Sequence, residues 1–180
     1  MNTRLLRLLS LIAAALLMSA AVTACGGDSS GAGASGPSRE YTDARGVAVD
    51  IPQQPGKIVT LAEGALDAAL ALGVTPVGTT SARGQTKAPA YLGAEAAGIP
   101  IVGTPRGPNL QQILKTRPDL ILVDDTTASR NSLDELSKIA PTLLIAKYAD
   151  GWEKYFKAVV HSASVESGLD ELVASQEEPV

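Results

Sequence analysis

The chain has one cysteine, Cys25, and one histidine, His161, and these two residues limit the chemistry that it could perform. A single cysteine can form neither an internal disulfide nor a metal site built from cysteines. A serine nucleophile activated by histidine would have to use His161, and no nucleophile elbow or phosphate-binding glycine motif follows a predicted strand. We therefore predict no catalytic residue, no metal site and no cofactor, and we expect that the protein is not an enzyme.

Cys25 follows a segment with the features of a secretory signal. Arg4 and Arg7 form a basic start, residues 8–18 are an apolar run, and small residues lead into Cys25. The sequence Val-Thr-Ala-Cys resembles the lipobox of bacterial lipoproteins, which implies cleavage before Cys25 and lipidation of its sulfur. A transmembrane helix is the alternative, but the apolar run is shorter than the ~20 residues needed to span a bilayer. We expect residues 1–24 to be a signal peptide and Cys25 to anchor the protein to the outer face of the cell membrane.

Composition and charge indicate one acidic domain on a tether. The 180 residues include 15 basic and 19 acidic side chains, and removal of residues 1–24 leaves 13 basic against 19 acidic ones, enough chain for one domain. This balance argues against a nucleic-acid partner, because binding to phosphates needs a basic face. Residues 25–38 are mostly Gly, Ser and Ala after the cysteine, so we expect a flexible tether.

The next segments predict a β-hairpin and then a parallel sheet. Residues 39–52 carry two short alternating runs on either side of a turn closed by Gly46. From Lys57 onward, short apolar runs alternate with helical patterns, which indicates a Rossmann-like α/β lobe with a central parallel sheet flanked by helices. We expect hairpin and lobe to occupy residues 39–150. The predicted strands are Lys57–Leu61, Thr75–Gly78, Ile99–Gly103, Leu120–Asp124 and Thr142–Lys147.

Three helices are predicted between these strands, one ending at Gly73, one between Asn109 and Pro118, and one ending at Pro141. In a parallel sheet of this kind, ligands bind outside the carboxyl ends of the strands. That rule selects five loops, namely Ala62–Gly64, Thr79–Gln85, Thr104–Pro108, Asp125–Ser129 and Tyr148–Gly151.

Several motifs of this lobe occur in a characteristic order. They are Lys57-Ile58-Val59-Thr60-Leu61, Leu66-Asp67, the run from Leu70 to Gly78, Tyr91-Leu92-Gly93, Val102-Gly103-Thr104, Pro108-Asn109-Leu110 and the run from Arg117 to Leu122. Together, from about Tyr41 to Val160, they resemble the amino-terminal lobe of substrate-binding lipoproteins for iron-siderophore and cobalamin ABC importers. The resemblance implies two α/β lobes joined by a long helix, a ferric siderophore held between them, and delivery to an importer permease and its ATPase.

The carboxyl-terminal part departs from this pattern. Residues 151–160 resemble the start of the interlobe helix, and we expect Trp152 to pack at the lobe junction rather than stack on ligand. Residues 161–180 form a polar tail where a second lobe would be expected, so we expect a truncated chain. The alternative is a self-sufficient one-lobe protein, a lipid-anchored surface interaction protein without a transport role.

The resemblance also implies the type of side chain that holds the ligand. Ferric siderophores are often anionic and rich in oxygen, so arginine and aromatic side chains suit them. We predict ligand contacts from Arg83, Arg106 and Tyr148 in the selected loops, and from Lys147 and Glu63 beside them. The alternatives are solvated loop cations and, for Glu63, a favourable charge at a helix N-terminus.

One position bears on the predicted permease partner. Family members commonly read Asn-Leu-Glu where this chain has Asn109-Leu110-Gln111, and that Glu pairs with arginines of the permease. Gln111 can hydrogen-bond an arginine but carries no charge. We therefore expect weaker docking at Gln111, unless a nearby acid such as Glu95 substitutes.

Overall fold

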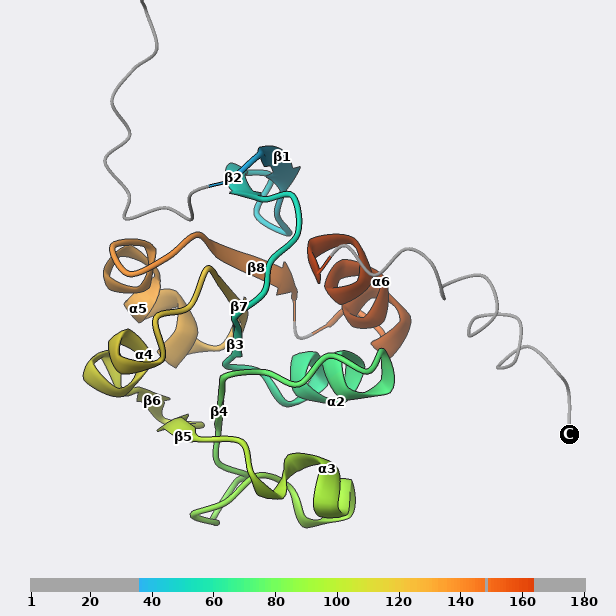
Figure 1. The fold of residues 1–180 in the computed structure, drawn as a ribbon, viewed down its shortest axis with the longest axis vertical. Coiled ribbons are helices and arrows are strands. Elements are labelled where there is room, and N and C mark those ends of the chain that lie inside the picture. Colours follow the sequence, from blue (N-terminus) through green and yellow to red (C-terminus); the bar gives the residue numbers. More distant parts are fainter. Residues whose placement is uncertain (1–35, 148, 164–180) are drawn as a thin grey trace, which may run out of the picture.

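The computed structural model of the chain describes residues 36–147 and 149–163. They form an α/β lobe whose mostly parallel sheet lies between helices, with a β-hairpin at one end (Figure 1). The predicted fold class is therefore confirmed. Cys25, Tyr148 and residues 164–180 lie outside the described residues.

The hairpin forms where the alternating runs predict it. Strands β1 (Ser38–Thr42) and β2 (Ala48–Pro52) pair antiparallel, with Ser38 opposite Pro52, so pairing begins at the last residue of the predicted tether. Gly46 in the turn has φ +81°, a left-handed conformation that glycine adopts without a steric penalty. The carboxylate of Asp43 accepts hydrogen bonds from the backbone N–H groups of Arg45 (2.8 Å) and Val47 (3.1 Å), which closes the turn.

The main sheet has six strands in the order β6-β5-β4-β3-β7-β8. All neighbours pair in parallel except β5 and β6. The first strand of this sheet, β3, is central; β4, β5 and β6 follow on one side of it, and β7 and β8 then lie on the other side. The direction of strand order therefore reverses beside β3, and open sheets of this kind bind ligands at such a point. The strands are β3 (Ile58–Thr60), β4 (Gly78–Thr80), β5 (Ile101–Thr104), β6 (Gly107–Pro108), β7 (Leu120–Asp124) and β8 (Thr142–Ala146).

Two details of the predicted strands are wrong, apart from shifts of one or two residues at the ends of other strands. The second strand runs over Gly78–Thr80 instead of Thr75–Gly78, because Pro76 lacks a backbone N–H and the pairing continues into buried threonines. There the Thr60 hydroxyl donates to the Thr79 hydroxyl at 3.1 Å, so these two buried hydroxyl groups are paired. The loop predicted at Thr104–Pro108 contains β6, which folds back antiparallel on β5, so the sheet is not entirely parallel.

The three predicted helices are confirmed as α2 (Glu63–Ala71), α4 (Leu110–Thr116) and α5 (Thr127–Ser137). Asn109 caps α4, where its side chain accepts from the Gln112 N–H at 3.1 Å, and Gly73 follows α2 at φ +73°. The short η1 (Ala90–Leu92) and α3 (Gly93–Ala97) were not predicted, because they are too brief to show an apolar period. The last helix, α6 (Trp152–Ala163), continues three residues past the predicted boundary at Val160.

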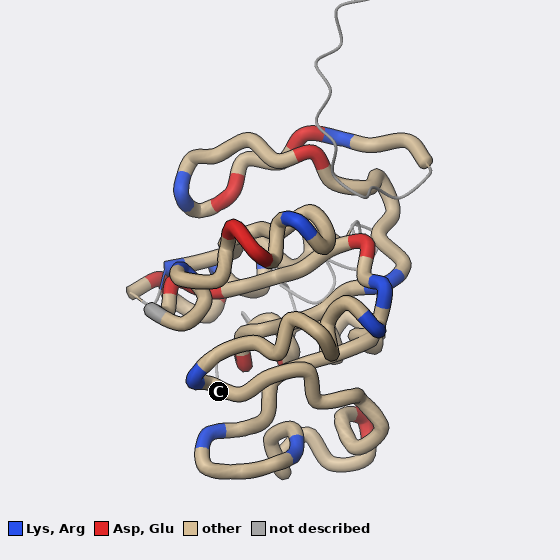
Figure 2. The backbone as a smooth tube through the Cα atoms, turned by 90° about the vertical axis from the view of Figure 1, so that its left-hand side faces the viewer, with Lys and Arg blue, Asp and Glu red and all other residues tan. Residues whose placement is uncertain are grey.

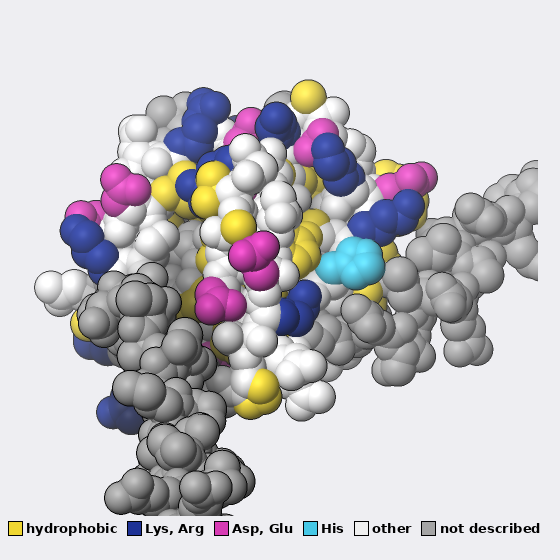
Figure 3. All heavy atoms as spheres, turned by 90° about the horizontal axis from the view of Figure 1, so that it is seen from above, with side chains coloured by type: hydrophobic (Ala, Val, Ile, Leu, Met, Phe, Trp, Pro, Cys, Tyr) yellow, Lys and Arg dark blue, Asp and Glu magenta, His cyan; other side chains and the backbone are white. Residues whose placement is uncertain are grey.

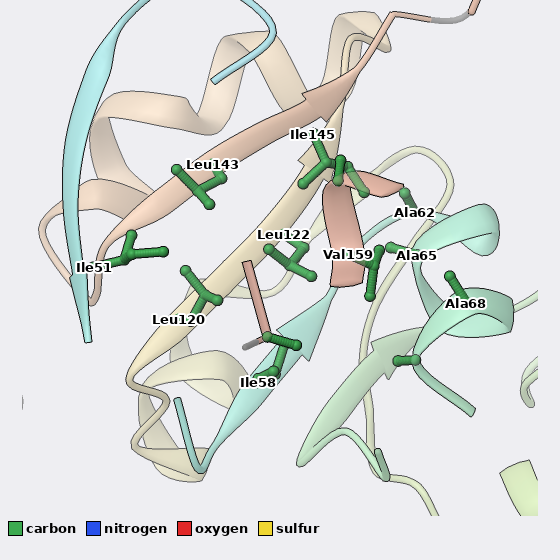
Figure 4. Packing of buried hydrophobic residues seen from close by; sticks show 13 residues of the cluster. Ile51, Ile58, Ala62, Ala65, Ala68, Leu120, Leu122, Leu143, Ile145 and Val159 are labelled. Atoms are coloured by element: carbon green, nitrogen blue, oxygen red, sulfur yellow. The ribbon is translucent and has the colours of Figure 1, made fainter. Parts of the chain in front are cut away.

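The core lies on both faces of the sheet, and the alternation of β7 divides it. Leu120 and Leu122 pack towards α2, α6 and the hairpin, whereas Ile121 and Val123 pack towards α4 and α5. Figure 4 shows the first of these faces, where alanines of α2 meet Val159 of α6 and the leucines of β7. These small side chains let α2 and α6 lie close together. The amino-terminal ends of the two helices lie at the same edge of the sheet.

The charged residues are dispersed over the surface. Lys and Arg positions are scattered along the chain in Figure 2, and Figure 3 shows acids and bases interspersed at the hairpin end. Within the two described ranges, no helix is long and apolar enough to cross a bilayer.

Candidate functional site

A cleft of about 750 Å³ lies at the carboxyl ends of the strands. Its walls come from the loops after β3, β4, β5 and β7 and from the first turns of α6, including Leu61, Thr80, Thr104, Asp124 and Trp152. This is the edge of the sheet that the sequence selects, because the strand ends, the loops and the helix N-termini point there together.

One wall of the cleft is a face of α2. The lining residues of this wall are spaced by the helical repeat, and they are Glu63, Gly64, Asp67, Ala68 and Ala71. Glu63 is exposed in the first turn, where a negative charge is favourable because the helix N-terminus carries a partial positive charge.

Asp67 on this wall is hydrogen-bonded to Tyr91 of η1. The Tyr91 hydroxyl lies 2.8 Å from Oδ1 and 2.9 Å from Oδ2 of Asp67, so the phenol donates to the carboxylate. Desolvation raises the pKa of Asp67, and the hydrogen bond partly opposes that rise. Desolvation, the same hydrogen bond and the carboxylate charges raise the pKa of Tyr91 to about 12. The phenol therefore stays protonated at neutral pH and keeps the carboxylate in place.

The loop between β7 and α5 places a second carboxylate in the cleft. Asp124 Oδ1 accepts from the Thr126 hydroxyl (2.8 Å), the Thr126 N–H (3.2 Å) and the Ser129 hydroxyl (3.0 Å). Thr126 is also the N-cap of α5, because its hydroxyl accepts from the Ser129 N–H at 3.4 Å. The network fixes the Asp124 carboxylate at the start of α5.

The N-terminus of α6 forms the third part of the cleft. Asp150 accepts from the Lys147 N–H (2.8 Å) and from the Lys154 ammonium (3.0 Å), and these two donors lower its pKa. Trp152 lines the cleft with 63% of its surface exposed, so the packing expected for it is not formed among the described residues. Tyr155 and Phe156 add half-buried aromatic rings to the same wall.

Tyr155 also joins this wall to α2. A Cβ atom added at Gly64 would lie 3.1 Å from the Tyr155 ring, so glycine at this position lets the ring cover the first turn of α2. The cleft can therefore offer aromatic rings, hydroxyl groups and several carboxylates to a ligand.

The five predicted ligand residues have different positions in the structure. Glu63 and Arg83 line the cleft, and both are exposed. Arg106 is exposed between the lining residues Pro105 and Gly107, but it does not line the cleft itself. Lys147 is exposed at the end of β8 and contributes its backbone N–H to Asp150 rather than a wall of the cleft. Tyr148 lies outside the described residues, and ligand contact by any of the five stays a prediction.

Sequence reasoning missed several lining residues because it searched the loops for cations and aromatic rings. Thr126 and Ser129 lie in a loop that it selected, and Asp124 ends a strand that it placed correctly. Asp67 is one helical turn beyond Glu63, so extending the α2 face from its first residue would have found it. Gln111 is exposed in the first turn of α4, outside the cleft lining, and its predicted role in docking stays untested.

No metal-binding cluster of three or more His, Cys, Asp or Glu side chains occurs in the described ranges. Three acids of the cleft are held by hydroxyl, amide or ammonium donors, namely Asp67, Asp124 and Asp150.

Comparison with known proteins identifies the family. The sequence profile of the periplasmic binding protein family matches residues 58–177, and the match continues past Val160, where the motif resemblance was expected to end. The iron(3+)-hydroxamate-binding protein FhuD of Bacillus subtilis is 32% identical over 135 residues, which cover 73% of this chain and 41% of FhuD.

Solved structures agree with this match. Staphylococcus aureus SirA, complexed with staphyloferrin B, superposes with a TM-score of 0.68 and 30% identity over 76% of this chain and 46% of SirA. The iron uptake ABC transporter substrate-binding protein PiuA of Streptococcus pneumoniae superposes with a TM-score of 0.63 and 25% identity, over 78% of this chain and 50% of PiuA. The chain thus spans half or less of the length of these relatives. With a family profile that matches most of the chain and a lobe that superposes on these structures, this protein belongs to the periplasmic binding protein family.

Proposed function

We propose that this chain is the extracytoplasmic solute-binding component of an ABC importer and that it captures a ferric siderophore. The observation that carries the proposal is the position of the cleft. It lies at the carboxyl edge of the sheet in a lobe that superposes on SirA complexed with staphyloferrin B. Open α/β sheets bind ligands at this edge.

The residues of the cleft suit such a ligand. The exposed guanidinium of Arg83 offers planar donors to chelate oxygens, and Trp152 offers a ring face for stacking. The hydroxyls of Thr80 and Thr104 lie at the ends of β4 and β5 in the same cleft. In this proposal the protein binds the chelate and delivers it unchanged, so it has no catalytic activity.

The location and the partners are part of the same proposal. Lipidation of Cys25 would hold the lobe at the outer face of the membrane, where an importer permease and its ATPase receive the ligand. Relatives named as binding proteins for iron chelates and for iron uptake support this reading. The alternative of a surface interaction protein without a transport role is not favoured, because these relatives are solute-binding proteins.

Fluorescence of Trp152 tests the proposal directly, because Trp152 is the only tryptophan and lines the cleft. We expect ferric siderophores to quench it in a saturable way, with a dissociation constant on the order of micromolar or below. Arg83→Ala should weaken binding several-fold, since it removes a donor to the chelate, whereas Arg130→Ala at an exposed position of α5 should not. Equilibrium dialysis with the same chelates provides a readout that does not depend on the tryptophan. The absence of saturable binding in both measurements would refute the proposal.

A further inference from the structure

The described part of the cleft has more negative than positive side chains. Five acids line it, namely Glu63, Asp67, Asp124, Asp150 and Glu153, against two cations, Arg83 and Lys157. One of the acids has a close ammonium partner, since Lys154 donates to Asp150 at 3.0 Å. The hydroxyl donors on Asp67 and Asp124 position these carboxylates but leave their charge in place.

The helix N-termini at the cleft do not offset this charge. Helices α2, α5 and α6 begin at the cleft, and a helix N-terminus can stabilise an anion because its free N–H groups carry partial positive charge. Here an acidic side chain of the protein already lies at the N-terminus of each of these three helices. Glu63 lies in the first turn of α2, Asp124 accepts from the cap of α5, and Glu153 lies in the first turn of α6. An anionic ligand would meet carboxylates at all three helix starts.

We infer that the cleft selects ferric chelates without net negative charge, such as hydroxamate complexes, over strongly anionic ones. The inference rests on the proposed function and narrows its ligand class. Three singly charged hydroxamates neutralise ferric iron, and a free amine on the ligand makes the complex cationic, whereas three doubly charged catecholates leave a trianion. Carboxylates repel the trianion and attract the cation. Sequence reasoning expected anionic ligands because the family resemblance implies ferric siderophores, which are often anionic, and among the acids of the cleft it named only Glu63 as a ligand residue.

The experiment compares three ferric complexes on the same protein, namely a cationic trihydroxamate, an uncharged trihydroxamate and a tris-catecholate. Affinities are measured by Trp152 quenching and by equilibrium dialysis, at low and at high salt. We expect the cationic and uncharged complexes to bind at least about tenfold more tightly than the trianion at low salt, with the difference narrowing at high salt because ions screen exposed charges.

A charge variant tests the cause. The double variant Glu63→Gln with Glu153→Gln replaces two exposed acids of the cleft, so it should raise affinity for the tris-catecholate and reduce the preference for the cationic and uncharged complexes. Asp134→Asn, on the exposed face of α5, should leave this preference unchanged. Equal or tighter binding of the trianion would overturn the charge inference while leaving siderophore capture in place. A preference that the double variant does not alter would also overturn it. If none of the complexes binds, both the inference and the proposed function fail.

Discussion

At the scale of single residues, the Asp67–Tyr91 pair is the clearest example of chemistry set by local surroundings. The raised pKa of Tyr91 means that folding favours its neutral phenol over the phenolate. Any stability that Tyr91 contributes in this way is therefore present below pH 10 and is lost as the pH rises towards 12. The difference in phenolate absorbance between the protein and Tyr91→Phe should therefore titrate near pH 12 instead of 10.0. Asp67→Asn should move this midpoint down, because it removes the carboxylate that raises it, and Glu95→Gln on α3 should not. A midpoint near the usual value in the unmodified protein would contradict the pairing.

At the scale of elements, the return of β6 onto β5 shapes the wall of the cleft that contains Gly107 and Pro108. The return depends on Gly103, since a Cβ there would lie 2.9 Å from the Pro108 Cα and 3.1 Å from the Gly107 oxygen. We expect Gly103→Ala to lower the free energy of unfolding by about 1–3 kcal/mol, because the backbone must move to admit the methyl group. Gly107→Ala is the matched control, with no atom within 4 Å of its added Cβ. Urea unfolding measures both, and equal stability of the two variants would refute this role for Gly103.

At the scale of the whole molecule, the hairpin connects elements that are far apart in the sequence. Arg39 donates to the His161 carbonyl of α6. Asp43 is 5% exposed and accepts from the Leu144 N–H of β8 at 3.4 Å, and the Ala44 N–H donates to the Leu144 carbonyl at 2.8 Å. The hairpin thus fastens the last described helix and the edge strand to the first strands of the chain.

Asp43→Ala should lower the free energy of unfolding by about 1–3 kcal/mol, because it leaves the buried N–H of Leu144 and the partly buried N–H groups of the turn without this acceptor. Asp50→Ala, on the exposed side of β2 in the same hairpin, should change it little. Thermal and urea unfolding provide the comparison. A loss of stability in the Asp50 variant as large as that in the Asp43 variant would contradict a specific role for the hydrogen bonds of Asp43.

The sequence alone predicted the elements that have a local signal. Leu120–Asp124 is a continuous apolar run and forms a strand with those bounds, and Asn109 and Gly73 mark helix ends by their own capping chemistry. The edge of the sheet where the cleft lies also followed from the order of strands and helices, because parallel connections bring the strand ends together.

The tertiary structure alone decided which side chains face the cleft and what charge they give it. Thr79 and Thr80 are buried in β4 because this strand pairs with β3 on one side and β5 on the other. The local sequence instead predicts the strand a few residues earlier, at Thr75–Gly78. Asp67, Asp124 and Asp150 come from three separate segments, and no local pattern reports that they share a cavity with Arg83. Local propensity determines helices and strands over a few residues, whereas the charge of a cleft is a sum over groups that only chain folding brings together.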